Sequence, residues 1–121
     1  MVVQTQAITQ TKTDILALIR PDMERLNDVV RTTLHSEVPL VNQVAEYLIN
    51  AGGKRLRPAI HLLLTRALQK TCPDTAYTLA AVVEFIHTST LLHDDVVDES
   101  DLRRGRQTAN ALFGNAASVL V

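Results

Sequence analysis

The segment that decides the fold runs from residue 75 to residue 98 and reads TAYTLAAVVEFIHTSTLLHDDVVD. It is rich in Ala, Leu and Val and is apolar on almost every side as far as Leu92, a pattern typical of a buried helix. A turn at residues 71–73 precedes it, and a charged stretch containing Gly105 follows it. We therefore predict one long, largely buried helix over residues 75–98.

The segments on either side of this helix repeat apolar residues at intervals of three or four, the spacing of an α-helix. Further helices are predicted over residues 13–20, 22–34, 40–51 and 58–70, with a weaker one from residue 109 onward. Residues 1–12 are polar and aperiodic, and are predicted to be a flexible lead-in to a single domain over residues 13–121. No segment has a strand pattern, so the predicted fold class is all-α.

The composition limits the class of protein. The chain has 121 residues, of which 46% are hydrophobic but only 3% aromatic, and such an aliphatic core suits helices packed on helices. Its 12 basic and 13 acidic side chains give a net charge of -1, which excludes the basic field of a nucleic-acid-binding protein. A single cysteine, no signal peptide and no apolar run of about 18 residues predict a cytoplasmic protein without a membrane anchor.

A cluster of carboxylates closes the long helix. Five of them fall between residues 94 and 101, and Asp94 and Asp98 lie one turn apart on one face, separated by about 40° in projection. Two neighbouring carboxylates repel each other, and the dipole at a helix C-terminus makes negative charge there still less favourable. Because nothing in folding favours this pair, we predict that it binds a hard cation, for which Mg²⁺ is the best match.

A plain structural alternative exists for the other acidic residues. Glu99 and Asp101 are expected to be solvated or paired with arginines, of which the sequence offers Arg103, Arg104 and Arg106. His87 lies seven residues before Asp94, on nearly the same face. It is either a packed core histidine or a ligand-facing one, and the sequence leaves both interpretations open.

Two basic stretches flank the helix in the sequence. GGKRLRP at residues 52–58 puts three cations between a glycine pair that ends one helix and Pro58, predicted to open the next at its first position. RRGR at residues 103–106 follows the acidic cluster. Free N–H groups at a helix start and neighbouring Lys and Arg side chains both favour anions. Two cationic clusters around a carboxylate pair therefore suggest a site for diphosphates.

These motifs resemble those of a known family. HDDVVDESDLRRG at residues 93–105 resembles the first aspartate-rich motif, DDxxD, of the trans-isoprenyl diphosphate synthases, or polyprenyl synthetases, and GGKRLRP resembles their upstream diphosphate-binding motif. The stretches EFIHTSTLLHDD at 84–95 and NALFGNAASVLV at 110–121 also fit, most closely the long-chain, octaprenyl-type members. The resemblance implies the N-terminal part of the isoprenoid synthase helical bundle.

The resemblance also implies a reaction and its residues. Members condense isopentenyl diphosphate sequentially onto an allylic prenyl diphosphate, with Mg²⁺ as cofactor. Asp94 and Asp98 would hold the metal at the allylic diphosphate, with Asp95 in support. Arg103 would contact the allylic diphosphate itself. The diphosphate of isopentenyl diphosphate would be bound by Lys54, Arg57, His87 and Arg104.

Product length and completeness follow from the same resemblance. Ser89 and Thr90 correspond to the floor under the growing prenyl chain, and because both are small, a long product is expected, of the kind that forms the ubiquinone side chain. The family's second aspartate-rich motif is absent, so the resemblance covers about the first third of a member. We therefore expect the chain alone to be inactive or nearly so, and to self-associate, as a homodimer or otherwise.

Other functions were weighed against this one. A non-catalytic helical subunit that binds Mg²⁺ or diphosphate, or that partners another synthase, remains the main alternative. A plain helical interaction domain would leave the pair of Asp94 and Asp98 unexplained. Terpene cyclases also carry an aspartate-rich helix end, but the basic loop at residues 52–58 indicates a second diphosphate and argues against them.

Overall fold

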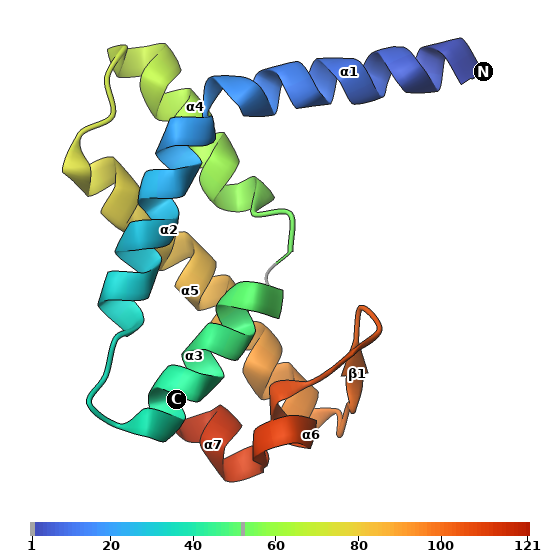
Figure 1. Cartoon of the computed structure of the whole chain (residues 1–121), viewed down its shortest axis with the longest axis vertical. Helices are drawn as coiled ribbons and strands as arrows, with labels where there is room; N and C mark the ends of the chain where they lie inside the picture. Colours follow the sequence, from blue (N-terminus) through green and yellow to red (C-terminus); the bar gives the residue numbers. More distant parts are fainter. Residues whose placement is uncertain (1, 52) are drawn as a thin grey trace.

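The computed structural model describes residues 2–51 and 53–121, which form a bundle of helices with one small hairpin (Figure 1). The elements, in chain order, are α1 (Val2–Leu18), α2 (Arg20–Leu34), α3 (Pro39–Ala51), α4 (Leu56–Gln69), α5 (Asp74–Val97), β1 (Leu102–Arg103), β2 (Arg106–Gln107), α6 (Ala109–Phe113) and α7 (Asn115–Leu120). The all-α prediction is therefore confirmed, with the hairpin as an addition. None of the helices in the described ranges is both long enough and apolar enough to cross a membrane.

The core forms where α2 and α4 pack against the first half of α5. Leu26 of α2 and Leu62 of α4 are fully buried, and they meet a surface of small residues on α5 that includes Ala80 and Ala81. Small side chains let the helix axes approach closely, and each buried leucine contributes about 2 kcal/mol of transfer free energy. The second half of α5 contacts α6 and α7 instead, and α3 packs against these two short helices.

The predicted lead-in is helical. Helix α1 begins at Val2, so the prediction that the first helix starts at residue 13 is wrong. The hydroxyls of Thr9, Thr11 and Thr13 each donate to the carbonyl oxygen four residues earlier, at 2.9–3.0 Å, and so are satisfied within the helix. The described side chains between residues 4 and 18 are exposed, and α1 projects away from the bundle (Figure 1). The flexibility of this segment stays a prediction.

Prolines mark the helix starts. Pro21 and Pro39 lie in the first turns of α2 and α3, where a missing N–H costs nothing. Helix α4 begins at Leu56, two residues before Pro58, so the prediction that Pro58 takes the first position is wrong by two residues. Arg55 precedes this helix in a left-handed conformation, with φ 51°.

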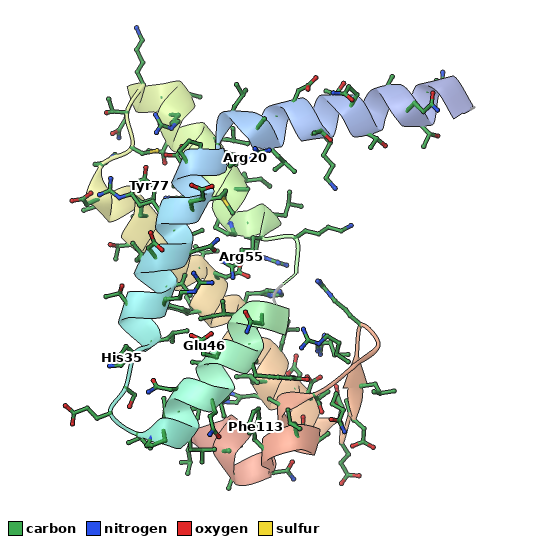
Figure 2. All side chains as sticks on the ribbon, in the orientation of Figure 1. Arg20, His35, Glu46, Arg55, Tyr77 and Phe113 are labelled. Atoms are coloured by element: carbon green, nitrogen blue, oxygen red, sulfur yellow. The ribbon has the colours of Figure 1, made fainter. Side chains whose placement is uncertain are left out.

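A polar latch joins α2, α4 and α5. The carboxylate of Asp22 is only 3% exposed, and it accepts hydrogen bonds from the Arg66 guanidinium, at 2.7 Å for Nη2, and from the Tyr77 hydroxyl at 2.6 Å. The hydrogen bonds from Arg66 hold the pKa of Asp22 below its ordinary value, whereas burial raises the pKa of Tyr77. The Arg25 guanidinium lies 4.6 Å from the centroid of the Tyr77 ring (Tyr77 is labelled in Figure 2). The latch holds the three helices in one register.

Helix α5 ends in a Schellman motif. The N–H of Ser100 donates to the carbonyl of Asp95 at 2.9 Å, and the N–H of Glu99 donates to the carbonyl of Val96 at 3.3 Å. Glu99 has φ 54°, a left-handed conformation that favours glycine. The motif turns the chain sharply toward the hairpin.

The hairpin was not predicted. Strands β1 and β2 pair Leu102 with Gln107 and Arg103 with Arg106, and the two-residue loop between them has positive φ at both Arg104 and Gly105. Positive φ at both positions is typical of a type I′ turn. Strands of two residues are too short to show a period of two, so no sequence pattern could have indicated them.

Candidate functional site

A cavity of about 340 Å³ opens between α3, α5, the loop at residues 53–57 and the hairpin. Its polar lining is mainly cationic and comes from three segments far apart in the sequence. The basic residues in the lining are Lys54, Arg55, Arg57, His87, Arg103, Arg104 and Arg106. All five residues predicted to bind substrate are in this set. The fold therefore joins two basic clusters that the sequence shows only as separate stretches.

Arg55 points away from its neighbours. Its guanidinium donates to the side-chain oxygen of Asn27 on α2 and, at 3.5 Å, to the carbonyl of Ile49 on α3. Arg55 has a left-handed backbone at the residue just before α4. Arg55 therefore anchors the loop to the bundle, while the side chains of Lys54 and Arg57 stay exposed at the cavity.

The two basic clusters meet at Gly53. The guanidinium of Arg104 occupies the space that a Cβ at Gly53 would take, so the hairpin reaches across to the backbone of the loop. Within the described ranges, neither Lys54, Arg57 nor Arg104 is part of an ion pair. Their charges are therefore uncompensated by protein groups, which is the condition for binding an anion. Gly52, the other half of the predicted glycine terminator, lies outside the described residues.

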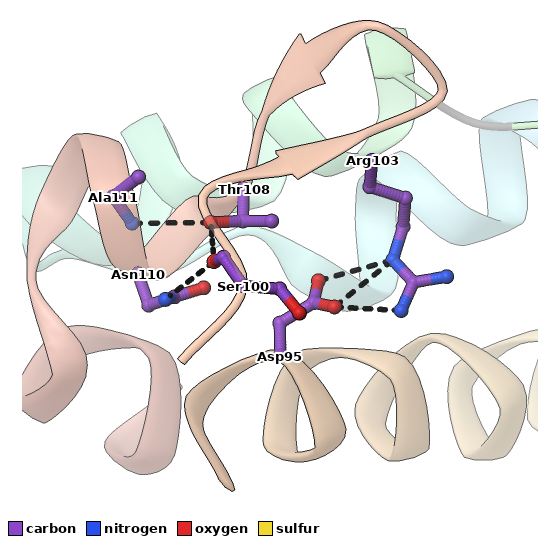
Figure 3. Close-up of polar contacts among 6 residues, drawn as sticks. All are labelled: Asp95, Ser100, Arg103, Thr108, Asn110 and Ala111. Carbon is purple, nitrogen blue, oxygen red and sulfur yellow. Dashed lines mark hydrogen bonds and ion pairs between the residues drawn. The ribbon is translucent and has the colours of Figure 1, made fainter. Parts of the chain in front are cut away.

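Asp95 and Arg103 form an ion pair beside this cavity (Figure 3). The Asp95 side chain is 7% exposed, and its oxygens accept from Nη2 of Arg103 at 2.6 Å and from Nε at 3.0 and 3.2 Å. These hydrogen bonds raise the pKa of the Arg103 guanidinium, and the charges of Asp94 and Asp98 raise it further. Asp95 therefore orients Arg103, whose own side chain remains 42% exposed.

The base of the hairpin is closed by a second set of bonds (Figure 3). The carbonyl of Ser100 accepts from the Thr108 hydroxyl at 2.7 Å and from the Asn110 amide at 3.0 Å, and Thr108 caps α6 by accepting from the N–H of Ala111. Ser100 also closes α5, so one residue ties the helix end to both sides of the hairpin. Arg103 and Arg104 project from a segment held at both ends.

Asp94 and Asp98 lie outside the cavity. Both side chains are exposed, and in the part of the chain that the structure describes neither is in an ion pair and no three His, Cys, Asp or Glu side chains form a metal cluster. At 100° per residue the pair occupies the strip of α5 next to His87, which lines the cavity edge. Two free carboxylates fit Mg²⁺, which commonly takes one or two from protein and its other ligands from water or phosphate.

The arginine partners expected for the other carboxylates are not found. Among the described residues, Glu99 and Asp101 form no ion pair, and Arg103 pairs with Asp95 instead. The reason is the direction of the chain, because the Schellman motif turns Glu99 outward while Asp95 points toward the hairpin.

Ser89 and Thr90, which were predicted to lie under the growing prenyl chain, face different sides of α5. Ser89 lines a second, mainly apolar cavity of about 180 Å³, together with Phe85 and Leu92 of the same helix. Thr90 is exposed and lies on the strip of α5 that leads to Asp94. The structure does not bring these two side chains together.

Tyr47 was not predicted as a site residue. This residue lines the cationic cavity and contacts the hairpin, yet in the sequence it lies within an ordinary amphipathic helix. Aromatic residues are rare in this chain, which has only two tyrosines and two phenylalanines, and this rarity could have drawn attention to Tyr47.

Comparison with known proteins shows the family of this chain. Residues 38–121 match the family model described as polyprenyl synthetase. The chain belongs to the polyprenyl synthetase family. It is 55% identical over 108 residues to octaprenyl diphosphate synthase of Haemophilus influenzae and 55% identical over 104 residues to that of Escherichia coli, covering 89% and 86% of this chain. Both alignments cover 32% of the relative. This chain therefore spans about a third of the length of the curated relatives it matches.

Solved structures place the fold in the same family. A polyprenyl synthase from Caulobacter crescentus, complexed with calcium and isoprenyl diphosphate, matches with TM-score 0.80 and 46% identity, over 88% of this chain and 32% of that one. A decaprenyl diphosphate synthase from Rhodobacter capsulatus matches with TM-score 0.84 and 49% identity, over 89% and 33%. The resemblance to polyprenyl synthetases and the helical bundle expected from it are confirmed.

Proposed function

We propose that this chain is the N-terminal part of a long-chain trans-polyprenyl diphosphate synthase, which adds isopentenyl diphosphate sequentially to an allylic prenyl diphosphate. The observation that carries the proposal is the cationic cavity next to two exposed carboxylates, Asp94 and Asp98, which form no ion pair in the described ranges. One polyanion fits among cations alone, and a second fits where a metal joins it to carboxylates. A helical module without catalysis would need only one of the two.

The cations of the cavity would bind isopentenyl diphosphate. Lys54 and Arg57 are exposed at one wall and Arg104 faces them from the hairpin, so a diphosphate between them would be contacted from both sides. His87 would add a donor from α5. A bound diphosphate would hold the double bond of this substrate in a fixed direction, which converts a collision between two substrates into a step within one complex.

The acidic strip would bind the allylic substrate. Asp94 and Asp98 would hold Mg²⁺, which when bound neutralises the negative charge of a departing diphosphate. Arg103 would donate to the same diphosphate, and Asp95 would keep its guanidinium in place through their ion pair. In this role Asp95 supports the site without binding the metal.

The strip of α5 below Asp94 would carry the prenyl chain. Leu79, Val83 and Ile86 are 54%, 38% and 64% exposed, and with Thr90 they form a continuous uncovered strip along the helix. Apolar walls exclude water from an electron-poor allylic carbon. Because Thr90 is small, a long chain can pass it, which favours a long product such as the ubiquinone side chain.

The same strip is the reason to expect little turnover by the 121 residues alone. With these side chains exposed, water would reach the reacting carbon, so we propose that the chain needs further protein surface over α5. That surface would come from additional polypeptide or from a second copy, since an uncovered apolar strip favours association. A cytoplasmic location completes the proposal.

Binding and turnover test the proposal separately. Titration calorimetry with inorganic diphosphate should give binding to the 121-residue chain that Mg²⁺ strengthens. Lys54→Gln should weaken it about tenfold, since a charged hydrogen bond contributes about 1.5 kcal/mol, and Asp98→Asn should remove the effect of Mg²⁺. Lys70→Gln is the matched control, because Lys70 is an exposed lysine at the far end of α4.

Incubation with radiolabelled isopentenyl diphosphate, an allylic diphosphate and Mg²⁺ should give no polyprenyl product from the chain alone. Absence of diphosphate binding would refute the proposed site. Product formed by the isolated chain would refute the need for further surface, and diphosphate binding unaffected by Lys54→Gln would refute the assignment of the cavity.

A further inference from the structure

The hairpin that carries Arg103 and Arg104 is too small to hold its own position. Its strands have two residues each, and residues 102–107 are all exposed. Isolated hairpins are at best marginally stable in water, and a left-handed arginine at the turn adds strain. Something outside the hairpin must therefore fix where its arginines lie.

The bonds to Ser100 hold the base of the hairpin and Asp95 holds Arg103, and helix α3 adds a contact to the second strand through Tyr47. The Tyr47 hydroxyl donates to the carbonyl of Gln107, and the guanidinium of Arg106 lies 5.2 Å from the centroid of the tyrosine ring. The ring also meets Phe113 of α6 edge-to-face, with centroids 5.6 Å apart and an interplanar angle of 77°. One partly buried side chain thus contacts both the second strand and the helix that follows it.

A second contact lies one turn further along α3. Nη1 of Arg106 donates to the carbonyl of Asn50 at 3.2 Å, near the carboxyl end of the helix, where carbonyls lack partners and attract cations. The loop with Lys54 and Arg57 follows soon after in the sequence. The last turns of α3 therefore connect to both cationic segments of the cavity, to one through the chain and to the other through Tyr47 and Arg106.

We propose that Tyr47 is a positioning residue for diphosphate binding. By holding the hairpin on α3, it sets the distance between Arg104 and the pair of Lys54 and Arg57, and so prepares the cavity for an anion before one arrives. The inference rests on the proposed function, because it assumes that these cations bind a diphosphate together. The proposal gives Tyr47, an aromatic residue outside the two basic motifs, a role in arranging their charged side chains.

The test uses the 121-residue chain and inorganic diphosphate. Tyr47→Phe removes one hydrogen bond and keeps the ring, so the dissociation constant should rise about fivefold. Tyr47→Ala removes the ring contacts as well, so the rise should be tenfold or more. Amide hydrogen exchange without ligand should be faster at residues 102–107 in both variants. Tyr77→Phe is the matched control, because it also removes one tyrosine hydrogen bond, to Asp22, but at a site away from the cavity. It should lower the free energy of unfolding and leave the dissociation constant unchanged, with no faster exchange at residues 102–107 than in the rest of the chain.

Each outcome has one interpretation. If the unsubstituted chain does not bind diphosphate, the proposed function fails. If it binds and both Tyr47 variants bind equally well, the positioning role is refuted while the proposed function stands. Weaker binding with unchanged exchange at residues 102–107 would also refute positioning, since it would indicate direct contact with the anion. Should Tyr47→Ala fail to fold by circular dichroism, Tyr47→Phe decides the question.

Discussion

Removing one carboxylate from the acidic end of α5 should have opposite effects at two positions. We predict that Asp95→Asn destabilises the chain, whereas Asp98→Asn stabilises it in the absence of metal. The two substitutions are chemically the same and lie within one turn of the helix. Only their partners differ: Asp95 is buried against Arg103, and Asp98 is exposed without an ion pair in the described structure.

The magnitudes follow from these contacts. Asp95→Asn breaks a charged pair with bonds of 2.6 and 3.0 Å, worth about 2 to 3 kcal/mol for a carboxylate that is 7% exposed. Arg103 is 42% exposed and regains water, which keeps the loss below that of a fully buried pair. Relief of repulsion and of the unfavourable helix dipole returns about 0.5 kcal/mol. The net loss is therefore about 2 kcal/mol, while Asp98→Asn has only the gain of about 0.5 kcal/mol.

Urea unfolding followed by circular dichroism at pH 7 measures both values. The unfolding free energies should move in opposite directions with unchanged m-values, at one protein concentration and in the presence of a chelator. If Asp95→Asn is neutral, the ion pair with Arg103 does not contribute as argued. If Asp98→Asn destabilises the metal-free chain, repulsion between Asp94 and Asp98 does not reduce its stability. The physical argument for a cation at this pair would then be lost.

Three other predictions concern stability and association. Folding lowers the pKa of Asp22, so the stabilisation by its carboxylate is fully present above about pH 4 and is lost as the pH falls through the folded pKa. Asp22→Asn should lower the free energy of unfolding by about 2 kcal/mol at pH 7, and this free energy should then fall less steeply with acid than in the unsubstituted chain. Equal pH slopes of the unfolding free energy would contradict the prediction. Glu99→Gly should raise the free energy of unfolding by about 1 kcal/mol, because the backbone at Glu99 is left-handed. Glu99→Ala keeps this backbone strain and should therefore raise the free energy of unfolding less. Equal increases would show that only the loss of the negative charge matters. Sedimentation should detect self-association of the chain. Ile86→Lys, on the uncovered strip of α5, should raise the dissociation constant of this association about tenfold. A strictly monomeric chain would refute the predicted self-association.

Local patterns were sufficient for the helices. Apolar spacing predicted α2 and α3 to within two residues at each end, because a helix face buried on a neighbour repeats every three or four residues. The apolar run at residues 75–98 predicted the bounds of α5 equally well, but the prediction that this helix is largely buried is wrong, since Leu79, Val83 and Ile86 are exposed. The same reasoning failed at residues 1–12, where helix α1 is exposed and has no buried face to leave a pattern. It failed again at the hairpin, whose position depends on contacts with α3 and not on its own residues.

The sequence by itself determined the fold class, the family resemblance and the inventory of charged groups, since each is written in spacing or in contiguous motifs. Only the tertiary structure decided how those charges are used. It paired Asp95 with Arg103, left Asp94 and Asp98 without an ion pair among the described residues, and brought Arg104 across to Gly53. Such contacts join residues up to about fifty positions apart. They depend on how α3 and α5 pack, because the energy of a charge is set by its partners and its exposure to water and not by its neighbours along the chain.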